Sequence, residues 1–215
     1  MPETLVIRLP EESGVDAQWT VIDDAGTRIG EVRRGALSDA ANEQLQRQVL
    51  VLVPGTQAVS ARANLPVRSA SKMLQVVPFA LEPQLAGDVT QMHFAVGARS
   101  SEGDVDVVAV ARDTMSDWVK TLADAGIVAR RILPDTAGVP VSENGISVVV
   151  LADEAYLREE DGSVFSVQHD SVVAALELLE YPTEQDGDDD EISIEPDEPE
   201  VSSEAPLKIN VYLDD

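Results

Sequence analysis

The stretch LPVRSASKMLQVVPFALEPQLAGDVTQMHFAVG, residues 65–97, is the part of this sequence that decides the fold. From Met73 onward its apolar residues recur at helical spacing, and Ser69 stands before them as a predicted N-cap. Because Pro78 lies inside this pattern, we expect the helix to kink there or to restart near Phe79. The last residues of the stretch alternate between apolar and polar, which predicts a strand, so the whole stretch is a packed α/β element.

The same stretch resembles the signature of one protein family, the cytoplasmic domain of the type II secretion system protein L. The residues that carry the resemblance are Leu65-Pro66, Leu74, Pro78-Phe79-Ala80-Leu81-Glu82, Gln84-Leu85, Asp88 and His93-Phe94-Ala95. Upstream Val53-Pro54-Gly55 and downstream Leu133-Pro134-Asp135 fit it too, so the resemblance covers most of residues 48–135. Domains of this family are degenerate actin-like domains, so the resemblance implies a bilobal α/β fold.

The composition restricts the chain to a limited set of protein classes. Its 215 residues include no cysteine, which excludes disulfides and thiol catalysis and fits a reducing compartment. The opening sequence, MPETLVIRLPEE, lacks the basic and apolar regions of a secretory signal. The longest apolar run, residues 49–53, is far shorter than the roughly 18 residues typical of a membrane span, so we expect the chain as given to be soluble.

The net charge of −25 limits the partners that this chain can bind. Such an acidic surface repels the phosphates of nucleic acids and of anionic lipids, and it attracts basic protein surfaces. Much of the excess lies in residues 183–206, where every charged residue is acidic and no apolar periodicity is present. We predict that these residues form a disordered acidic excursion and that the chain binds no nucleic acid.

One order of elements, β-β-β-α-β, is predicted twice along the chain. In the first part, strands are expected at residues 4–9, 18–23, 27–32 and 49–53, with a helix at 38–45 that Ser38 would cap. Near the end, strands are expected at 146–152, 155–159, 163–167 and 208–213, with a helix at 172–179 that Asp170 would cap. Two such units around a middle region are typical of actin-like folds.

We therefore predict a bilobal actin-like (RNase H-like) α/β fold. Its expected parts are a first unit at residues 1–64, a middle subdomain at 65–135, a second unit at 136–182 and 207–215, and the excursion at 183–206. Besides the broken helix, the middle subdomain is expected to hold strands at 91–96, 105–111 and 128–133 and a helix at 114–125. Asp113 is the predicted N-cap of this second helix, and Gly126 is its predicted C-cap.

Two hairpins are the places where an actin-like ATPase would cradle phosphates with the backbone amides of glycine-rich turns. Here residues 9–14 and 153–155 occupy these places, and they carry acidic side chains without a neighbouring lysine. No P-loop pattern is present, so we predict neither catalysis nor a cofactor, and an actin-like ATPase with nucleotide between its lobes is the alternative. His93 and His169 have no partners at metal-ligand spacing, so no metal site is predicted.

The resemblance implies a docking function without enzymatic activity. Such a domain is the cytoplasmic part of a single-pass inner-membrane protein that recruits the secretion ATPase to the membrane by binding its N-terminal domain. The resemblance also implies contacts with other platform proteins, of the protein M and protein F types, and it is compatible with a homodimer. We therefore expect the chain to lie at the cytoplasmic face of the bacterial inner membrane, with a transmembrane helix and a periplasmic domain after Asp215.

Acidic residues are the candidates for partner binding, because a fold that has abandoned nucleotide can use the freed surface for a basic protein. The candidates in the second hairpin are Asp153, Glu154, Glu159, Glu160 and Asp161. Glu82 and Gln84, on the helix of the family signature, form a second candidate face. For both sets an ordinary solvent-exposed surface is the competing interpretation.

Overall fold

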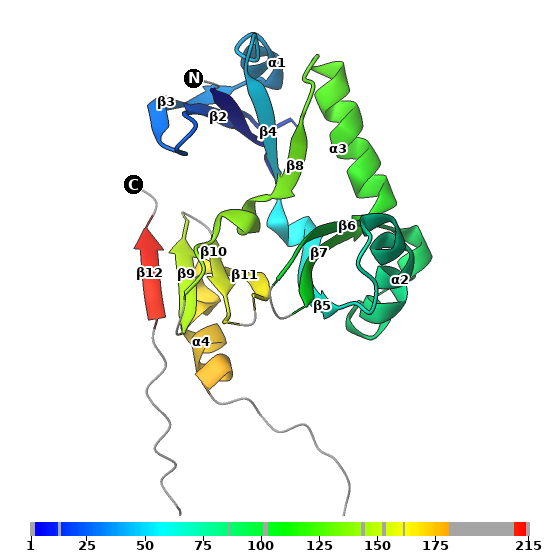
Figure 1. The fold of residues 1–215 in the computed structure, drawn as a ribbon. Coiled ribbons are helices and arrows are strands. Elements are labelled where there is room, and N and C mark those ends of the chain that lie inside the picture. Colours follow the sequence, from blue (N-terminus) through cyan, green and yellow to red (C-terminus); the bar gives the residue numbers. More distant parts are fainter. Residues whose placement is uncertain are drawn as a thin grey trace, which may run out of the picture.

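Two β-sheets form the framework of the molecule, and the computed structural model in Figure 1 describes residues 3–12, 14–85, 87–100, 103–142, 145–151, 154–160, 162–180 and 209–213. The first sheet contains β1 (Thr4–Arg8), β2 (Ala17–Ile22), β3 (Arg28–Gly35), β4 (Gln48–Val53) and β8 (Arg131–Pro134), in the order β3-β2-β1-β4-β8. Strands β1, β4 and β8 run parallel, whereas β2 is antiparallel to both of its neighbours.

The core of the first sheet follows from the alternating burial of its apolar strands. In β1 and β4 every second residue is buried, because successive side chains of a strand point to opposite faces. Two helices, α1 (Leu37–Ala41) and α3 (Arg112–Asp124), contribute to the same cluster of buried residues. From α3 the buried side chains are Trp118 and Leu122, which stand four residues apart and so share one face of the helix.

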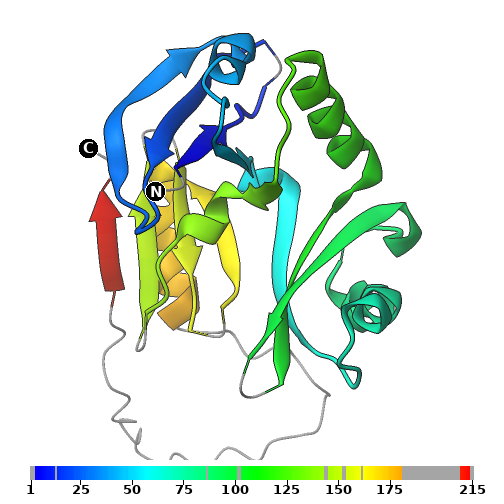
Figure 2. The ribbon, with the colours of Figure 1, turned by 45° about the horizontal axis from the view of Figure 1, so that its top comes forward.

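The second sheet has the order β12-β9-β10-β11-β5-β7-β6. Its strands are β5 (Ala58–Asn64), β6 (Met92–Arg99), β7 (Asp104–Ala111), β9 (Ile146–Val150), β10 (Glu154–Arg158), β11 (Val164–Gln168) and β12 (Ile209–Leu213). Helix α2 (Ala70–Leu81) packs near the β6 end, and α4 (Val172–Glu180) packs near the β9–β11 end. Figure 2 shows these two helices apart, with β12 at the outer edge of the sheet beside β9.

The two predicted β-β-β-α-β units are confirmed, and they share one topology. In the first sheet, β1, β2 and β3 form two successive antiparallel hairpins, and β4 then pairs in parallel with β1, which gives the order β3-β2-β1-β4. In the second sheet β11-β10-β9-β12 repeats this order, with β12 parallel to β9. The α/β class with two lobes is therefore the fold of this chain, and strand β12 completes the second unit.

The predicted N-cap of α2 is confirmed, since the Ser69 Oγ accepts a hydrogen bond from the backbone N–H of Lys72. The helix runs through Pro78 as one element as far as Leu81, so of the two outcomes expected at this proline, a kink or a restart near Phe79, the restart does not occur. Three side chains on one face of α2 are buried against the sheet, namely Met73, Val77 and Leu81. Tertiary packing of that face holds the helix together despite the one hydrogen bond that a proline cannot make.

Two other predicted caps are wrong. Ser38 lies inside α1, which begins after Ala36 and ends at Ala41, and Asp113 lies in the first turn of α3, which begins after Ala111. In both cases an alanine stands at the N-cap position, so no side chain caps the helix, and a strand ends at that alanine or directly before it. At the other end of α3 the predicted glycine stop is found one residue beyond the C-cap: Ala125 is the C-cap, and Gly126 follows it with φ +74°.

Two strands connect the middle region to both sheets. Strand β5, which no sequence pattern predicted, pairs with β7 over its whole length and places residues 58–64 in the second sheet. Strand β8 pairs with β4 and returns the chain to the first sheet. The predicted acidic excursion at residues 183–206 lies outside the described residues.

Candidate functional site

The candidate site lies where two parallel strands of the first sheet end next to each other. Strands β4 and β8 are paired in parallel, with Val53 opposite Pro134; a 3-10 turn follows β8 directly and follows β4 after Pro54. The turn after β4 is Gly55–Gln57, and the turn after β8 is Asp135–Gly138. In open α/β sheets, the carboxyl ends of adjacent strands are the usual place for a ligand.

Gly55 and Asp135 bind each other across this edge. The backbone N–H of Gly55 donates a hydrogen bond of 2.9 Å to Oδ1 of Asp135, whose side chain is almost fully buried. A Cβ atom on Gly55 would stand 2.3 Å from Cγ2 of Thr136 and 2.8 Å from Oδ1 of Asp135. Glycine is therefore required here, because no side chain fits between the two turns.

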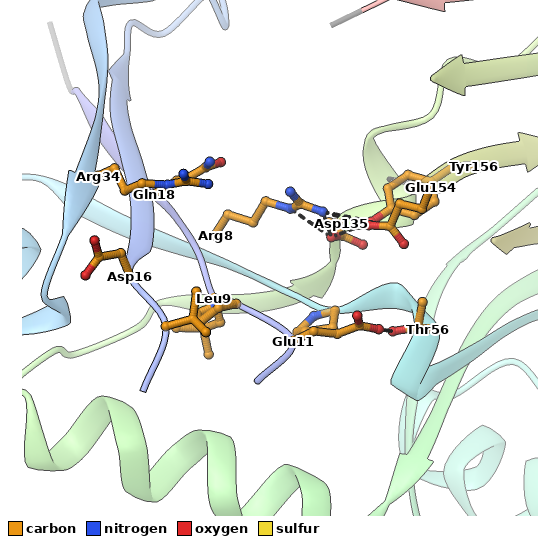
Figure 3. A pocket seen from close by; sticks show the side chains of 13 residues that line it. Arg8, Leu9, Glu11, Asp16, Gln18, Arg34, Thr56, Asp135, Glu154 and Tyr156 are labelled. Atoms are coloured by element: carbon orange, nitrogen blue, oxygen red, sulfur yellow. Dashed lines mark hydrogen bonds and ion pairs between the residues drawn. The ribbon is translucent and has the colours of Figure 1, made fainter. Parts of the chain in front are cut away.

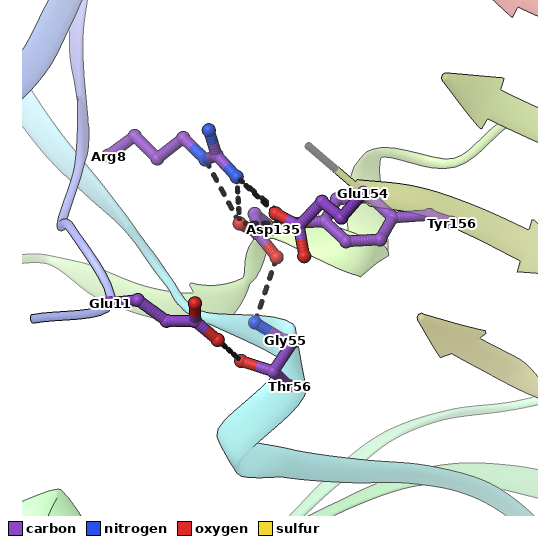
Figure 4. A network of polar contacts seen from close by, with 7 residues as sticks. All are labelled: Arg8, Glu11, Gly55, Thr56, Asp135, Glu154 and Tyr156. Atoms are coloured by element: carbon purple, nitrogen blue, oxygen red, sulfur yellow. Dashed lines mark hydrogen bonds and ion pairs between the residues drawn. The ribbon is translucent and has the colours of Figure 1, made fainter. Parts of the chain in front are cut away.

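The other oxygen of Asp135 connects the two lobes (Figure 4). Its Oδ2 accepts hydrogen bonds from Arg8 Nε at 3.0 Å and from the hydroxyl of Tyr156 at 2.8 Å. Arg8 is the last residue of β1 in the first sheet, whereas Tyr156 is in the middle of β10 in the second. One buried carboxylate thus holds side chains from both sheets.

Glu154 adds a second carboxylate to this network. Its Oε1 lies 2.8 Å from the Tyr156 hydroxyl and 3.2 Å from Nη2 of Arg8, and the same Nη2 donates to the Tyr156 hydroxyl at 2.9 Å. The hydroxyl has one proton, which it shares between the carboxylates of Asp135 and Glu154. Arg8 supplies the remaining donors, so the site is a closed network of one cation, two anions and one phenol.

The electrostatics of the site keep both donors protonated. Burial raises the pKa of the Tyr156 hydroxyl far above its ordinary value, and the neighbouring charge of Asp135 raises it further. Burial alone lowers the pKa of the Arg8 guanidinium, but its contacts with Tyr156 and Asp135 outweigh this effect and leave that pKa above its ordinary value. Tyr156 therefore acts as a neutral donor and Arg8 as a permanent cation.

A pocket of about 170 Å³ opens in front of the network (Figure 3). Its charged lining residues are Glu11, Asp16, Asp135 and Glu154 on the acidic side and Arg8 and Arg34 on the basic side. Four carboxylates against two guanidinium groups give it a formal charge of −2. It is also smaller than the roughly 300 to 1,000 Å³ of typical small-molecule sites. This arrangement suits a structural crosslink and opposes the binding of a polyphosphate.

The described part of the chain offers neither a metal site nor a membrane-spanning helix. Among the described residues, no group of three or more histidine, cysteine, aspartate and glutamate side chains is arranged to hold a metal ion. Within the same residues, no helix is both long and apolar enough to cross a bilayer.

The acidic candidates of the second hairpin lie at the two ends of β10. Glu154 begins the strand and belongs to the network, whereas Glu159 and Glu160 follow its other end, about 17 Å away for a strand of this length. The side chain of Glu160 accepts a hydrogen bond from the backbone N–H of Gly145. Asp153 and Asp161 lie outside the described residues. The structure brings Glu159 and Glu160 together and separates them from Glu154.

The second candidate face is a solvent-exposed turn. Glu82 and Gln84 form the ends of a 3-10 turn directly after α2, and both are exposed. Nearby on α2 itself, the side chain of Phe79 is 72% exposed, which is unusual for an aromatic residue.

Sequence reasoning did not identify the residues of the interlobe network other than Glu154. Arg8, Tyr156 and Asp135 are distant in sequence, and only the fold brings them together. One signal was available, because Pro-Gly and Pro-Asp follow two short apolar strands at Gly55 and Asp135. Both dipeptides contributed to the sequence analysis only as parts of the family resemblance.

Comparisons with known proteins bear on the family and the fold of this chain. The protein family described as type II secretion system (T2SS), protein L, matches residues 5–186. The type II secretion system protein L of Vibrio cholerae serotype O1 is 27% identical over 184 residues, which are 83% of this chain and 45% of the relative. The chain thus spans less than half the length of that relative.

Solved structures resemble the fold. The cytoplasmic domain of EpsL, an inner-membrane component of the type II secretion system of Vibrio cholerae, has a TM-score of 0.70 at 22% identity, over 99% of this chain and 82% of that one. A PilM-PilN type IV pilus biogenesis complex has a TM-score of 0.51 at 13% identity, over 77% of this chain and 60% of that one. Because the family match covers most of its residues, this chain belongs to the type II secretion system protein L family.

Proposed function

We propose that this chain is a non-enzymatic docking domain that recruits the secretion ATPase to the cytoplasmic face of the inner membrane for protein export. Family membership supports the place of the chain in the secretion platform. The observation that carries the non-enzymatic part is the closed network at the carboxyl ends of β4 and β8. The groups that a nucleotide would need there are already bonded to protein carboxylates.

The network opposes nucleotide binding in two ways. A phosphate cradle needs free backbone N–H groups and cations, but the N–H of Gly55 and the guanidinium of Arg8 both donate to Asp135. A polyphosphate placed in the pocket would also meet the carboxylates of Glu11 and Glu154. Binding would require breaking a buried ion pair and leaving Asp135 unpaired, which costs several kcal/mol.

The partner of the proposed docking domain is the N-terminal domain of the secretion ATPase. The acidic turn with Glu159 and Glu160 and the exposed turn with Glu82 and Gln84 are the two candidate faces for it. Other inner-membrane platform proteins are further proposed partners, since a PilM-PilN complex has a related fold. The anchor and periplasmic part of the whole protein belong to this proposal as well, because the chain covers less than half of its relative.

The decisive experiment compares two ligands on the same purified chain. The isolated N-terminal domain of the cognate ATPase is titrated into it by calorimetry, and magnesium ATP is tested by thermal shift. We expect saturable binding of the ATPase domain and no shift with magnesium ATP. A ligand at 100 times its Kd adds about 2.7 kcal/mol to the free energy of unfolding, so nucleotide binding would raise Tm by several degrees.

Each outcome discriminates between the two functions. A Tm increase with magnesium ATP that the Tyr156→Phe variant alters would support the ATPase alternative. Absence of ATPase binding at protein concentrations well above the micromolar range would contradict the docking function. The N-terminal domain of an unrelated ATPase of similar charge is the matched control for nonspecific electrostatic attraction.

A further inference from the structure

Strand β6 is the outer strand of the second sheet at the end opposite to β12, and Figure 1 shows it beside α2. Its residues pair with β7 on one side, and no described strand pairs with its other side. A row of backbone N–H and C=O groups along Met92–Arg99 therefore faces outward. Such a row is a template on which another extended chain can pair.

Both edges of the first sheet carry features that β6 lacks. In β3, four of the eight residues are charged and the pairing with β2 shifts register, and β8 has only four residues and ends on Pro134. Charge, irregular pairing, proline and short length are the usual means by which edge strands avoid other chains. From Met92 to Val96, β6 pairs regularly with β7 and contains no proline, lysine, arginine, aspartate or glutamate. This edge is open to another strand.

An apolar groove of about 480 Å³ adjoins the same edge. From α2 it is lined by Leu74 and Phe79, whose side chains are 43% and 72% exposed, and from β6 it is lined by His93 and Phe94. Large apolar side chains that are exposed together mark interaction surfaces on folded domains. We define the β6 surface as the unpaired side of residues 92–96 together with Leu74 and Phe79.

The charge of the β6 surface selects the kind of partner. Although the chain has a net charge of −25, none of the described residues that line the groove is a carboxylate, and Arg112 is its one permanent cation. A basic partner finds no counter-charge there, whereas an acidic partner meets the least repulsion. A second copy of this chain is acidic, and it brings an edge strand of equal length and the same exposed apolar side chains.

We infer that the β6 surface binds a second copy of this chain, with the two β6 strands paired antiparallel about a two-fold axis. Such an interface uses the same patch on both copies. The axis stands perpendicular to the joined sheet, so both α2 helices lie on the same face and cover the exposed Leu74 and Phe79 of one another. The pair uses up both β6 edges, so assembly stops at two copies. This inference does not depend on the ATPase.

The experiment is sedimentation velocity of the whole chain between about 1 µM and 1 mM, at low and at high salt. The first variant, Ala95→Glu, places a carboxylate at an exposed position of β6, and its matched control is Val32→Glu on the edge strand β3. The second variant, Phe79→Ser, removes the exposed ring, and its control is Leu178→Ser, at a 67% exposed position of α4. Circular dichroism and Tm verify that each variant keeps its fold.

We expect the mass of the wild-type chain to rise from 23.0 kDa toward twice that value, with a dimer Kd below about 100 µM. Ala95→Glu should raise this Kd at least tenfold, because each copy adds a carboxylate close to the two-fold axis, and Phe79→Ser should raise it at least threefold. Each control should leave the Kd within about twofold of wild type. Higher salt should tighten the dimer, because it screens the repulsion between two chains of like charge.

Three results would overturn the inference: a monomer at every concentration and salt, growth beyond two copies, or equal weakening by Ala95→Glu and Val32→Glu. Titration with the ATPase N-terminal domain separates the inference from the proposed function. If the chain stays monomeric and Ala95→Glu abolishes ATPase binding, the β6 surface binds the ATPase and the second-copy inference fails. If the dimer forms and the ATPase domain does not bind, the inference stands and the docking function fails.

Discussion

The backbone N–H of Gly55 donates a hydrogen bond of 2.9 Å to the Oδ1 of Asp135, although 80 residues separate the two along the chain. The other oxygen of that carboxylate binds Arg8 from β1 and Tyr156 from β10. Asp135 therefore fixes the ends of two parallel strands and also joins the first sheet to the second. This network lies at the carboxyl ends of adjacent parallel strands, where open α/β sheets usually bind a ligand.

Replacement of Gly55 by alanine tests the close approach of the two turns. The new Cβ would lie 2.3 Å from Cγ2 of Thr136, so either the turn or the Asp135 hydrogen bond must shift. We expect Gly55→Ala to lower the free energy of unfolding by about 1–3 kcal/mol, as overpacking of a tight site does. Urea denaturation followed by tryptophan fluorescence measures the change.

Gly138→Ala is the matched control for that variant. Gly138 ends the turn that begins at Asp135, and a Cβ placed on it meets no atom within 4 Å. Its substitution is expected to leave stability unchanged or to raise it by about 0.4–1 kcal/mol, because alanine restricts the unfolded chain. Equal destabilisation by both variants would show that packing at Gly55 is not the cause.

The Tyr156 hydroxyl makes stability depend on alkaline pH. Its pKa in the folded chain is raised far above the ordinary value of about 10, chiefly by burial. A raised pKa contributes stability that is fully present below about pH 10 and is lost as pH rises toward the folded value. We therefore expect the free energy of unfolding to fall above about pH 10 in wild type, and to fall less steeply in Tyr156→Phe.

Tyrosinate absorbance at 295 nm provides a direct measurement of this titration. In the folded chain Tyr156 should remain protonated at pH 11, where a solvent-exposed tyrosine is ionised. Wild type and Tyr156→Phe should then show the same absorbance change between pH 8 and 11 while folded, and should differ by one tyrosine in denaturant. A smaller change in the folded variant would mean that Tyr156 ionises normally.

Strand β12 is predicted to be necessary for the second unit. It pairs with β9 along five residues, from Ile146 to Val150, and closes that edge of the sheet. A chain that ends at Tyr181 exposes this edge, so we expect loss of cooperative unfolding or a Tm lower by more than about 10 °C. Differential scanning calorimetry measures both.

An internal deletion is the control for the truncation. Removal of residues 185–201 retains β12 and shortens a segment without apolar periodicity. Since loop-closure free energy changes slowly with loop length, Tm should move by no more than a few degrees. A large decrease in Tm would show that the acidic segment stabilises the fold.

Charge reversal tests the acidic turn after β10 as the ATPase face. The variant Glu159→Lys/Glu160→Lys is expected to slow association with the ATPase N-terminal domain and to weaken the salt dependence of the rate. The double variant Asp24→Lys/Glu31→Lys, in the exposed turn between β2 and β3 and on the exposed strand β3, is the control because it changes the net charge by the same amount. Stopped-flow kinetics at several ionic strengths provide the comparison.

An unchanged association rate in the double variant would place the interface elsewhere. The turn that follows α2 is then the remaining candidate, and Glu82→Lys tests it in the same assay. Because Glu160 accepts a hydrogen bond from Gly145, circular dichroism must first establish that the double variant is folded.

Local chemistry in the sequence determined most elements of this protein. Short apolar segments predicted β1 and β4, period-two alternation predicted β12, helical spacing predicted α2 and α3, and Ser69 and Gly126 were predicted to end helices. The β-β-β-α-β order of both units followed from the predicted strands together with the helices expected at residues 38–45 and 172–179. Each of these signals acts within a few residues, so a single sequence contains it.

Only the tertiary structure decided three further features, which are strand β5, the continuous helix α2 and the interlobe network. Strand β5 forms because β7 pairs with it, and α2 continues through Pro78 because its apolar face is buried on the sheet. In the interlobe network, Arg8 lies more than 100 positions from Asp135 and from Tyr156 in the sequence. The local sequence around each residue does not indicate that their side chains form hydrogen bonds with one another. Hydrogen bonds and packing between distant residues depend on the relative placement of whole sheets, which local propensity does not fix.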